Sequence, residues 1–169
     1  MKGIFKTDAQ KLVSPILMRG IVLSGMIILF ILMGGSDKGI GVLISVEFMP
    51  SDSYFRLLVL PAAVYWIYFF SGAIRVHSEA ARSVEGITKI IKTGAYGIVR
   101  HPIYAGDMVL SWGAFFYFPN PMTFLGAIWL NSVLFFWMKL EEKFLAAKFG
   151  KDYEEYRQEV PMYIPKLGK

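Results

Sequence analysis

The sequence contains no cysteine among its 169 residues, and it has only two histidines, His77 and His101. Without cysteine there is no disulfide, no thiol nucleophile and no thiolate metal ligand. Two histidines are too few for a histidine-rich metal centre, so we expect no bound metal. Charged residues are also scarce: they make up 18% of the chain, below the share of about 25% that is usual in soluble domains.

Apolar residues are abundant instead, with 55% hydrophobic and 16% aromatic side chains. This composition is typical of a small membrane protein, and the length favours one domain over residues 1–169. The net charge of +5 would fit a nucleic-acid partner, but the basic residues flank the apolar runs. We therefore interpret them as topology signals and expect no nucleic acid.

Four apolar runs are candidates for membrane-spanning helices. They cover residues 15–33, 55–74, 102–118 and 122–140. About 20 apolar residues in a helix cross a bilayer, so the predicted fold is an all-α, polytopic membrane helical bundle with about four spans.

The segments around these runs carry their own signals. Pro119-Asn120-Pro121 predicts a tight helical hairpin between the last two runs. We also expect an amphipathic helix at the membrane surface over 76–92. A further helix is predicted to reach about Phe149 and to stop at Gly150.

The number of lysine and arginine residues is alternately high and low in successive polar segments. There are three in residues 1–14, one in 34–55, five in 75–101, none in 119–121 and seven in 139–169. Cytoplasmic segments of membrane proteins carry an excess of these residues. We therefore expect both termini and the middle segment in the cytoplasm, and no cleaved signal peptide.

The stretch Gly94–Gly106 places several polar side chains at a membrane boundary. Arg100, His101 and Tyr104 are costly there unless they have partners. Pro102 suits the first turn of a helix. Two interpretations fit: an interfacial belt that anchors a helix, or a binding site for a polar, anionic group.

Glu141 and Glu142 follow directly on the fourth run. They are either ordinary solvated charges, or a pair suited to hold an ammonium group or a ribose diol. We place them near the C-terminal side of a helix, where the dipole disfavours anions. The predicted hairpin would return them to the membrane face that holds Arg100 and His101.

Two further polar residues lie inside apolar runs. Asn131 is about three helical turns before Glu142 and on the same face. An interhelical hydrogen bond is the favoured interpretation for it, with a cofactor contact as the alternative. Asp107 lies one turn into the third run and is expected either to stay wet at the rim or to pair with Arg100 or Lys92.

Taken in order, these motifs resemble the isoprenylcysteine carboxyl methyltransferase family, which is related to the membrane phospholipid methyltransferases. The motifs are Gly94-x-Tyr96-x-x-x-Arg100-His101-Pro102-x-Tyr104-x-Gly106, Asn120-Pro121, Glu141-Glu142, Phe149-Gly150-x-x-Tyr153-x-x-Tyr156 and Val160-Pro161. The resemblance covers residues 86–167, which it implies to be the cofactor-binding part. Residues 1–75 would form an N-terminal two-helix part.

The resemblance implies S-adenosylmethionine as the cofactor, bound at the cytoplasmic face. The expected cofactor-binding residues are Gly94, Tyr96, His101, Pro102, Tyr104, Asn131, Glu141 and Glu142. His101 and Tyr104 would contact the methionine end, and the acidic pair the amino group or ribose. Arg100 and Glu142 are the expected catalytic residues, with Arg100 near the reacting centre.

The expected reaction is methyl transfer to a lipophilic acceptor that enters from the bilayer, such as an isoprenylcysteine-type carboxylate. Arg100 would orient a carboxylate by paired hydrogen bonds, whereas an amine acceptor would need Glu142 or Asp107 as base. The alternatives are a phospholipid or small thiol or amine methyltransferase, a non-catalytic membrane module of the same fold, and an NADPH-dependent reductase. We expect the cytoplasmic membrane of a prokaryote, and the sequence does not determine the oligomeric state.

Overall fold

A computed structural model describes residues 21–25, 46–50, 53–76 and 89–166. These residues form helices, turns and irregular segments, with no strand among them. In chain order the elements are the 3-10 helix η1 (Tyr54–Leu58) and the α-helices α4 (Val59–Val76), α5 (Ala95–Ile98), α6 (Pro102–Tyr117), α7 (Pro121–Phe149) and α8 (Lys151–Glu159). The predicted all-α class is therefore confirmed for the described part of the chain.

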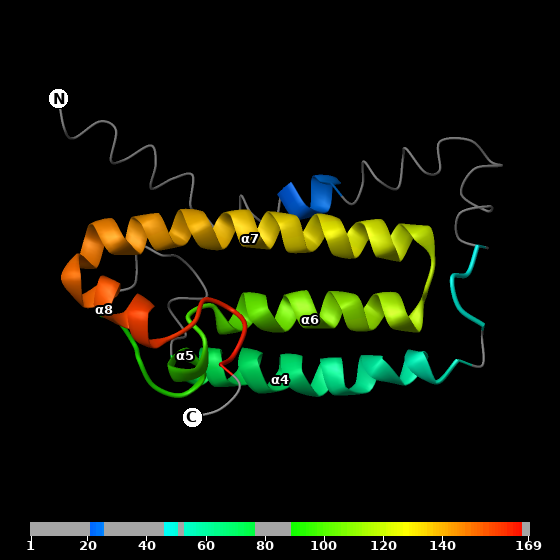
Figure 1. Ribbon diagram of the computed structural model, residues 1–169, viewed down its shortest axis with the longest axis horizontal. Coiled ribbons are helices and arrows are strands. Elements are labelled where there is room, and N and C mark those ends of the chain that lie inside the picture. Colours follow the sequence, from blue (N-terminus) through cyan, green and yellow to red (C-terminus); the bar gives the residue numbers. More distant parts are fainter. Residues whose placement is uncertain (1–20, 26–45, 51–52, 77–88, 167–169) are drawn as a thin grey trace.

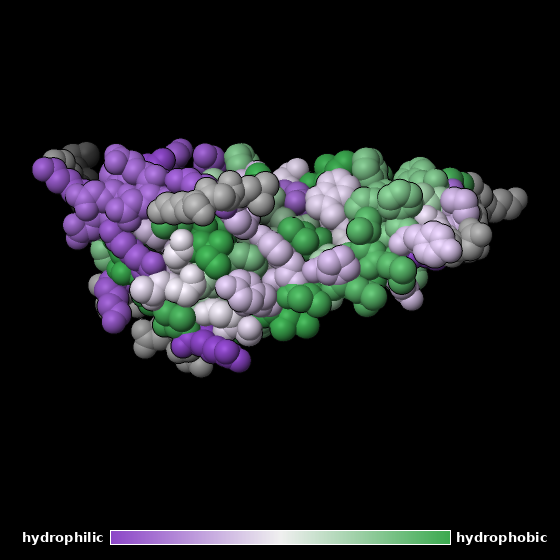
Figure 2. Space-filling view, turned by 60° about the horizontal axis from the view of Figure 1, so that its bottom comes forward, coloured by the Kyte–Doolittle hydropathy of each residue, from purple (hydrophilic) through white to green (hydrophobic). Residues whose placement is uncertain are grey.

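The three long helices α4, α6 and α7 lie side by side along the long axis of the molecule (Figure 1). The short helices α5 and α8 gather at one end, beside the last turns of α7 and the first turn of α6. We call this the polar end, because hydrophilic residues gather there, whereas apolar residues cover much of the rest of the visible face (Figure 2).

Two helical stretches, Tyr54–Val76 and Pro121–Phe149, are long and apolar enough to cross a membrane. Within the apolar 18-residue stretch of each, only 17% and 28% of the residues are buried inside the molecule. The core helix of a soluble protein would be mostly buried. Val64 on α4 and Phe136 on α7 each leave 67% of their surface exposed. Exposed apolar side chains of this kind suit contact with lipid.

The predicted apolar runs correspond to helices wherever the structure describes them. The second run forms η1 and α4, and the third forms α6. The fourth run and the charged helix expected after it are one continuous helix, α7, which ends at Phe149 before Gly150. Two of the four expected spans thus have the length and apolar character of a membrane helix.

Two predicted elements fall largely outside the described residues. Of the first run, 15–33, residues 21–25 are described and are helical. Of the surface helix expected over 76–92, residues 77–88 lie outside the described part, and residues 89–92 are not helical.

The predicted turn between α6 and α7 is confirmed, and its sequence explains its geometry. The Asn120 side chain accepts a hydrogen bond from the Thr123 N–H at 3.0 Å and caps α7. Pro121 occupies the first turn of α7, where its missing N–H removes no helical hydrogen bond. The Phe48 N–H donates to the Pro119 carbonyl at 2.6 Å, which ties the segment before η1 to this turn.

Helices α4 and α6 approach so closely that a side chain is excluded between them. A Cβ atom added at Gly113 would lie 2.6 Å from the Cβ of Ala62, and one at Gly106 would lie 3.2 Å from Trp66 Cδ1. Small residues at helix interfaces allow this close approach in membrane proteins. The packing fixes the N-terminal end of α6, which carries the polar motif, against α4.

Candidate active site

The Arg100-His101-Pro102 sequence begins α6 at the polar end. Pro102 is at the start of the helix and His101 is its N-cap. The N–H groups of Arg100 and His101 donate to the carbonyls of Pro161 and Met162 at 2.9 and 3.0 Å. The chain that leaves α8 therefore runs along the motif, and we call residues 157–163, which comprise the end of α8 and the segment after it, the C-terminal strap.

Glu141 and Glu142 lie inside α7 and are only 8% and 4% exposed. The interpretation of ordinary solvated charge is therefore wrong. Because α7 continues to Phe149, the pair lies about two turns before the helix end. The expected unfavourable dipole effect is also wrong, since that effect is confined to the last turn.

His101 lies between the two carboxylates. Its Nδ1 is 3.5 Å from Glu141 Oε2, and its Nε2 is 3.6 Å from Glu142 Oε1. The Tyr104 hydroxyl, one turn further along α6, donates to Glu141 Oε1 at 2.7 Å. The rings of His101 and Tyr104 are stacked, with centroids 5.8 Å apart. The hairpin therefore brings the predicted motif and the predicted acidic pair together.

Arg100 is the most heavily bonded side chain of this site. Its Nε donates to Glu142 Oε1 at 2.7 Å, and its Nη2 donates to the same oxygen. Its Nη1 donates to the carbonyls of Arg157, at 3.0 Å, and of Val160. The side chain is 8% exposed. We call Arg100, His101, Tyr104, Glu141 and Glu142 the polar cluster.

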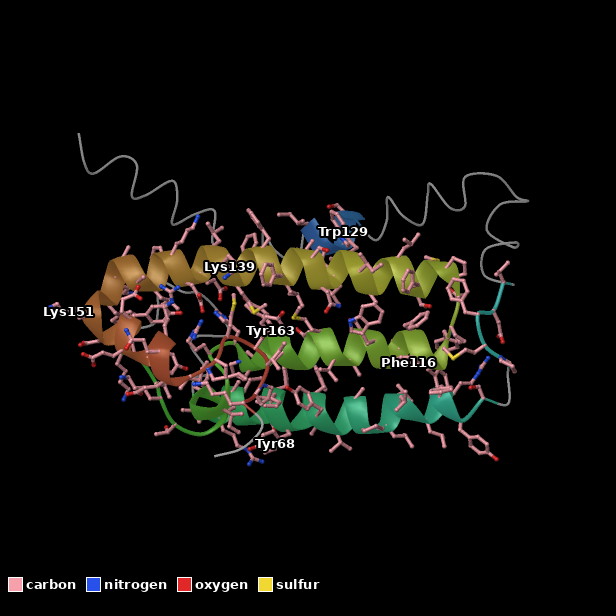
Figure 3. All side chains as sticks on the ribbon, in the orientation of Figure 1. Tyr68, Phe116, Trp129, Lys139, Lys151 and Tyr163 are labelled. Atoms are coloured by element: carbon pink, nitrogen blue, oxygen red, sulfur yellow. The ribbon has the colours of Figure 1, made fainter. Side chains whose placement is uncertain are left out.

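Helix α8 and the C-terminal strap pack against the polar cluster. The Tyr156 hydroxyl donates to the Tyr96 carbonyl at 2.6 Å, and Tyr153 is 1% exposed. Arg157 Nε lies 3.7 Å from Glu142 Oε2. The Tyr163 ring lies beside α7, where it meets Phe135 edge-on with centroids 6.2 Å apart (Figure 3). Tyr153 and Tyr156 belong to the sequence motifs, but the sequence alone assigns neither of them a role.

Gly94 and Tyr96 lie at the short helix α5, next to the polar cluster. Gly94 has φ +62°, a conformation that favours glycine. Burial, followed by the Coulombic effect of Glu141, raises the pKa of Tyr96 to about 12. The phenol therefore remains neutral and able to donate a hydrogen bond at physiological pH.

Asn131 and Asp107 are not members of the polar cluster. The Asn131 amide donates to Ser111 Oγ on α6 at 2.8 Å, which confirms the favoured interhelical bond. It lies about 16 Å along α7 from Glu142. Asp107 accepts a hydrogen bond from Trp66 Nε1 on α4 at 2.7 Å, whereas the sequence predicted a wet side chain or a pair with Arg100 or Lys92.

The charge of His101 should make stability depend on pH. Burial alone would lower its pKa, but attraction by the carboxylates of Glu141 and Glu142, which lie 3.5 and 3.6 Å from its two ring nitrogens, outweighs burial and raises the pKa above 6.5. The stabilisation is therefore fully present below about pH 6.5 and is lost as pH rises through the raised pKa.

We expect the difference in melting temperature between wild type and His101→Gln to shrink between pH 6 and pH 9. Thermal unfolding in detergent across this range measures it. A difference that stays constant or grows with pH would contradict a protonated His101 between the carboxylates.

Comparison with known proteins identifies a family. The profile of the phospholipid methyltransferase family matches residues 43–152, more than half of the chain. The match starts well before residue 86, where the sequence resemblance was expected to begin, and so includes α4. No solved structure gives a significant match.

Curated relatives share parts of the chain. Methanethiol S-methyltransferase of Crocosphaera subtropica is 38% identical over 78 residues, 44% of this chain and 28% of that protein. A probable protein-S-isoprenylcysteine O-methyltransferase of Oryza sativa is 35% identical over 98 residues, 57% of this chain and 48% of that protein. A Delta(14)-sterol reductase of Methylotuvimicrobium alcaliphilum is 32% identical over 81 residues, 46% of this chain and 19% of that protein.

This chain spans less than half the length of each of these relatives. The apolar helices and the shared methyltransferase names point in the same direction, to a membrane protein of a methyltransferase group. Together with the profile match across residues 43–152, they show that the chain belongs to the phospholipid methyltransferase family.

Proposed function

We propose that this protein is an integral membrane methyltransferase that uses S-adenosylmethionine to methylate a lipophilic acceptor. The observation that carries the proposal is the polar cluster, in which the α6 motif and the α7 carboxylates meet at the polar end. Two buried carboxylates beside an imidazole and a phenol match a ligand that has an ammonium group and a diol.

Unpartnered polar atoms support a ligand at this place. His101 Nε2 and the Tyr153 hydroxyl are buried and have no hydrogen-bond partner among the described residues. Buried polar atoms are nearly always hydrogen-bonded, so each such atom calls for an explanation. A bound polar group beside Glu142 would give His101 Nε2 a partner.

When bound, S-adenosylmethionine supplies a methyl group on a cationic sulfur, which in-line attack by the acceptor removes. The chain's own residues then have to align the reactants and exclude water more than to transfer protons. Glu141 and Glu142 would hold the ammonium or ribose hydroxyls, and the Tyr104 ring offers an aromatic face near a cation. Gly94, Tyr96 and Pro102 would shape the wall of the site, with Asn131 further along α7.

For the acceptor we propose a lipophilic molecule such as an isoprenylcysteine-type carboxylate that enters from the bilayer. A small thiol is the second candidate. It is favoured by the relatives named for methanethiol S-methylation, and by Arg100, whose donors are already bonded within the protein. A thiolate needs no paired hydrogen bonds for orientation, whereas a carboxylate acceptor would compete for them.

The proposed topology has four spans within one domain, with the polar end and both termini in the cytoplasm of a prokaryote. Residues 1–75 form its N-terminal part and residues 86–167 its cofactor-binding part. The positions of basic residues support this orientation, because the segments 75–101 and 139–169 hold most of them. In the described part of the chain, α5, the end of α7 and α8 from these segments gather at the polar end.

Binding of S-adenosylhomocysteine to detergent-purified protein tests the proposed cofactor by calorimetry. We expect saturable binding that weakens at least about tenfold in Glu141→Gln, since a hydrogen bond to a charged group contributes about 1.5–3 kcal/mol. Arg75→Ala, at an exposed position in the last turn of α4, is the matched control and should bind like wild type.

Two results would overturn the proposal. One is the absence of nucleoside binding to folded wild-type protein. The other is saturable binding of NADPH in place of S-adenosylhomocysteine, which would favour a reductase instead. Scintillation counting of lipid extracts after incubation with methyl-labelled cofactor, with and without an added thiol, separates the two acceptor candidates. Cofactor binding with no labelled product in either extract would indicate a non-catalytic module.

A further inference from the structure

We propose that Arg100 is a positioning residue that clamps the C-terminal strap, residues 157–163, onto Glu142, rather than a group that binds the methyl acceptor. The inference deepens the proposed function, because the clamp would hold one side of the cofactor site. It replaces the role expected from the sequence, in which Arg100 orients an acceptor carboxylate near the reacting centre.

The bonding of the guanidinium group supports a clamp. An arginine side chain has five N–H donors in a fixed plane. Nε and Nη2 donate to Glu142 Oε1 on α7, and Nη1 donates to the carbonyls of Arg157 and Val160. One edge of the planar group thus binds the Glu142 carboxylate and the Nη1 side binds the strap, so the guanidinium joins the two.

The carbonyls that Arg100 binds are ones that need a donor. Helix α8 ends at Glu159, and the last carbonyls of a helix have no partner within it. They also form the negative end of the helix dipole, where a cation is stabilising. Arg157 donates from its own side chain to Glu154 and lies near Glu142, so it does not replace Arg100 at these carbonyls.

The main chain of the motif holds the strap a second time. The N–H groups of Arg100 and His101 donate to Pro161 and Met162. Beyond them, Tyr163 packs against the buried apolar cluster of Phe69, Ala95, Val99 and Ala105. A shift of the strap would therefore disturb both the Arg100 guanidinium and His101, and through them the carboxylate of Glu142.

An acceptor-binding role would require different geometry. Bidentate recognition of a carboxylate uses two parallel N–H donors of one guanidinium. In Arg100 these edges already face Glu142 and the strap carbonyls. An acceptor could take them only by breaking buried hydrogen bonds to a charged group.

Hydrogen–deuterium exchange of the ligand-free protein in detergent tests the clamp directly. In Arg100→Ala we expect strap amides to exchange at least about tenfold faster, the effect of losing one hydrogen bond to a charged group. Arg100→Lys keeps the charge but not the planar fork, so it should fold and show the same change more weakly. The matched control is Arg56→Ala, which removes an exposed arginine–glutamate pair far from the strap.

Affinity for S-adenosylhomocysteine gives a second readout. Arg100→Ala and Glu142→Gln should each weaken binding, and the double variant should be little worse than either, because the two residues act as a unit. An unchanged strap exchange in Arg100→Ala and Arg100→Lys, with a raised KM for the acceptor alone, would overturn the clamp. A strap that responds in protein unable to bind the nucleoside would instead uphold the clamp and refute the proposed cofactor.

Discussion

Replacement of Glu142 by alanine is expected to destabilise the protein by about 3–5 kcal/mol, the usual loss when one partner of a buried ion pair is removed. The change would leave the guanidinium of Arg100 and the imidazole of His101 buried without the carboxylate that both face. Steric-trap or thermal unfolding measurements in detergent report the loss. The effect should be among the largest for any single polar residue of the described chain.

Glu47→Ala is the matched control, because the Glu47–Arg56 pair has the same chemistry and a similar length of 2.7 Å. Its side chains are 46% and 22% exposed, against 5% for Glu142 and 8% for Arg100. Solvent screens such a pair, so its removal should cost about 0–1 kcal/mol. Equal losses at the two sites would contradict the burial-based argument.

Glu142→Gln separates folding from ligand binding. It keeps the shape and one hydrogen-bond acceptor while removing the charge. We expect a smaller loss of stability than in Glu142→Ala, together with weakened nucleoside affinity in a folded sample. Wild-type nucleoside affinity in folded Glu142→Gln would show that this carboxylate charge does not contribute to the ligand site.

Gly113→Leu is expected to give the second large effect, a loss of stability of about 3 kcal/mol or more by overpacking the interface between α4 and α6. A Cβ at this position already lies 2.6 Å from Ala62 Cβ and 3.3 Å from Val59 Cα. Neither atom is the end of a flexible side chain, so no rotamer change makes room. The helices would have to separate, and unfolding temperature in detergent would fall accordingly.

Two companions distinguish overpacking from a general intolerance of α6. Gly113→Ala should lose about 1–3 kcal/mol, and adding Ala62→Gly should recover most of it by removing the clashing atom. Ala114→Leu, on the exposed side of the same helix, should be nearly neutral. If Gly113→Leu and Ala114→Leu behaved alike, the close approach of the two helices would not govern stability here.

Much of the secondary structure follows from local sequence. The apolar runs predict α4, α6 and the first part of α7, because each run is long enough for a helix and ends in polar or proline-rich residues. The Pro119-Asn120-Pro121 turn follows from the capping by Asn120 and from the preference of proline for a helix start. What local sequence missed is the continuity of α7, since Glu141 and Glu142 looked like the end of an apolar helix and are buried within a longer one.

The candidate site was predicted in outline and not in its contacts. The predicted hairpin places His101 and Tyr104 beside the acidic pair, and in the structure both side chains contact Glu141. The sequence did not predict that Arg100 binds the strap, or that Asp107 is hydrogen-bonded to Trp66 on α4. The partners of Arg100 and Asp107 are distant from them in sequence, and the chain contains many other polar groups with which each could have paired.

The sequence by itself determined the class of molecule. Its apolar runs, its scarce charge and its ordered motifs indicate a helical membrane protein with a polar site at one end, because burial of backbone in lipid leaves helices as the simplest solution. Only the tertiary structure decided which groups pair within that site. The choice depends on the close α4–α6 contact at Gly113 and on the strap that runs back along the motif. Both contacts are set by packing between distant segments, which no local pattern records. The strap contact makes Arg100 a buried link between α7 and the C-terminal strap, whereas the sequence predicted a residue that orients the acceptor.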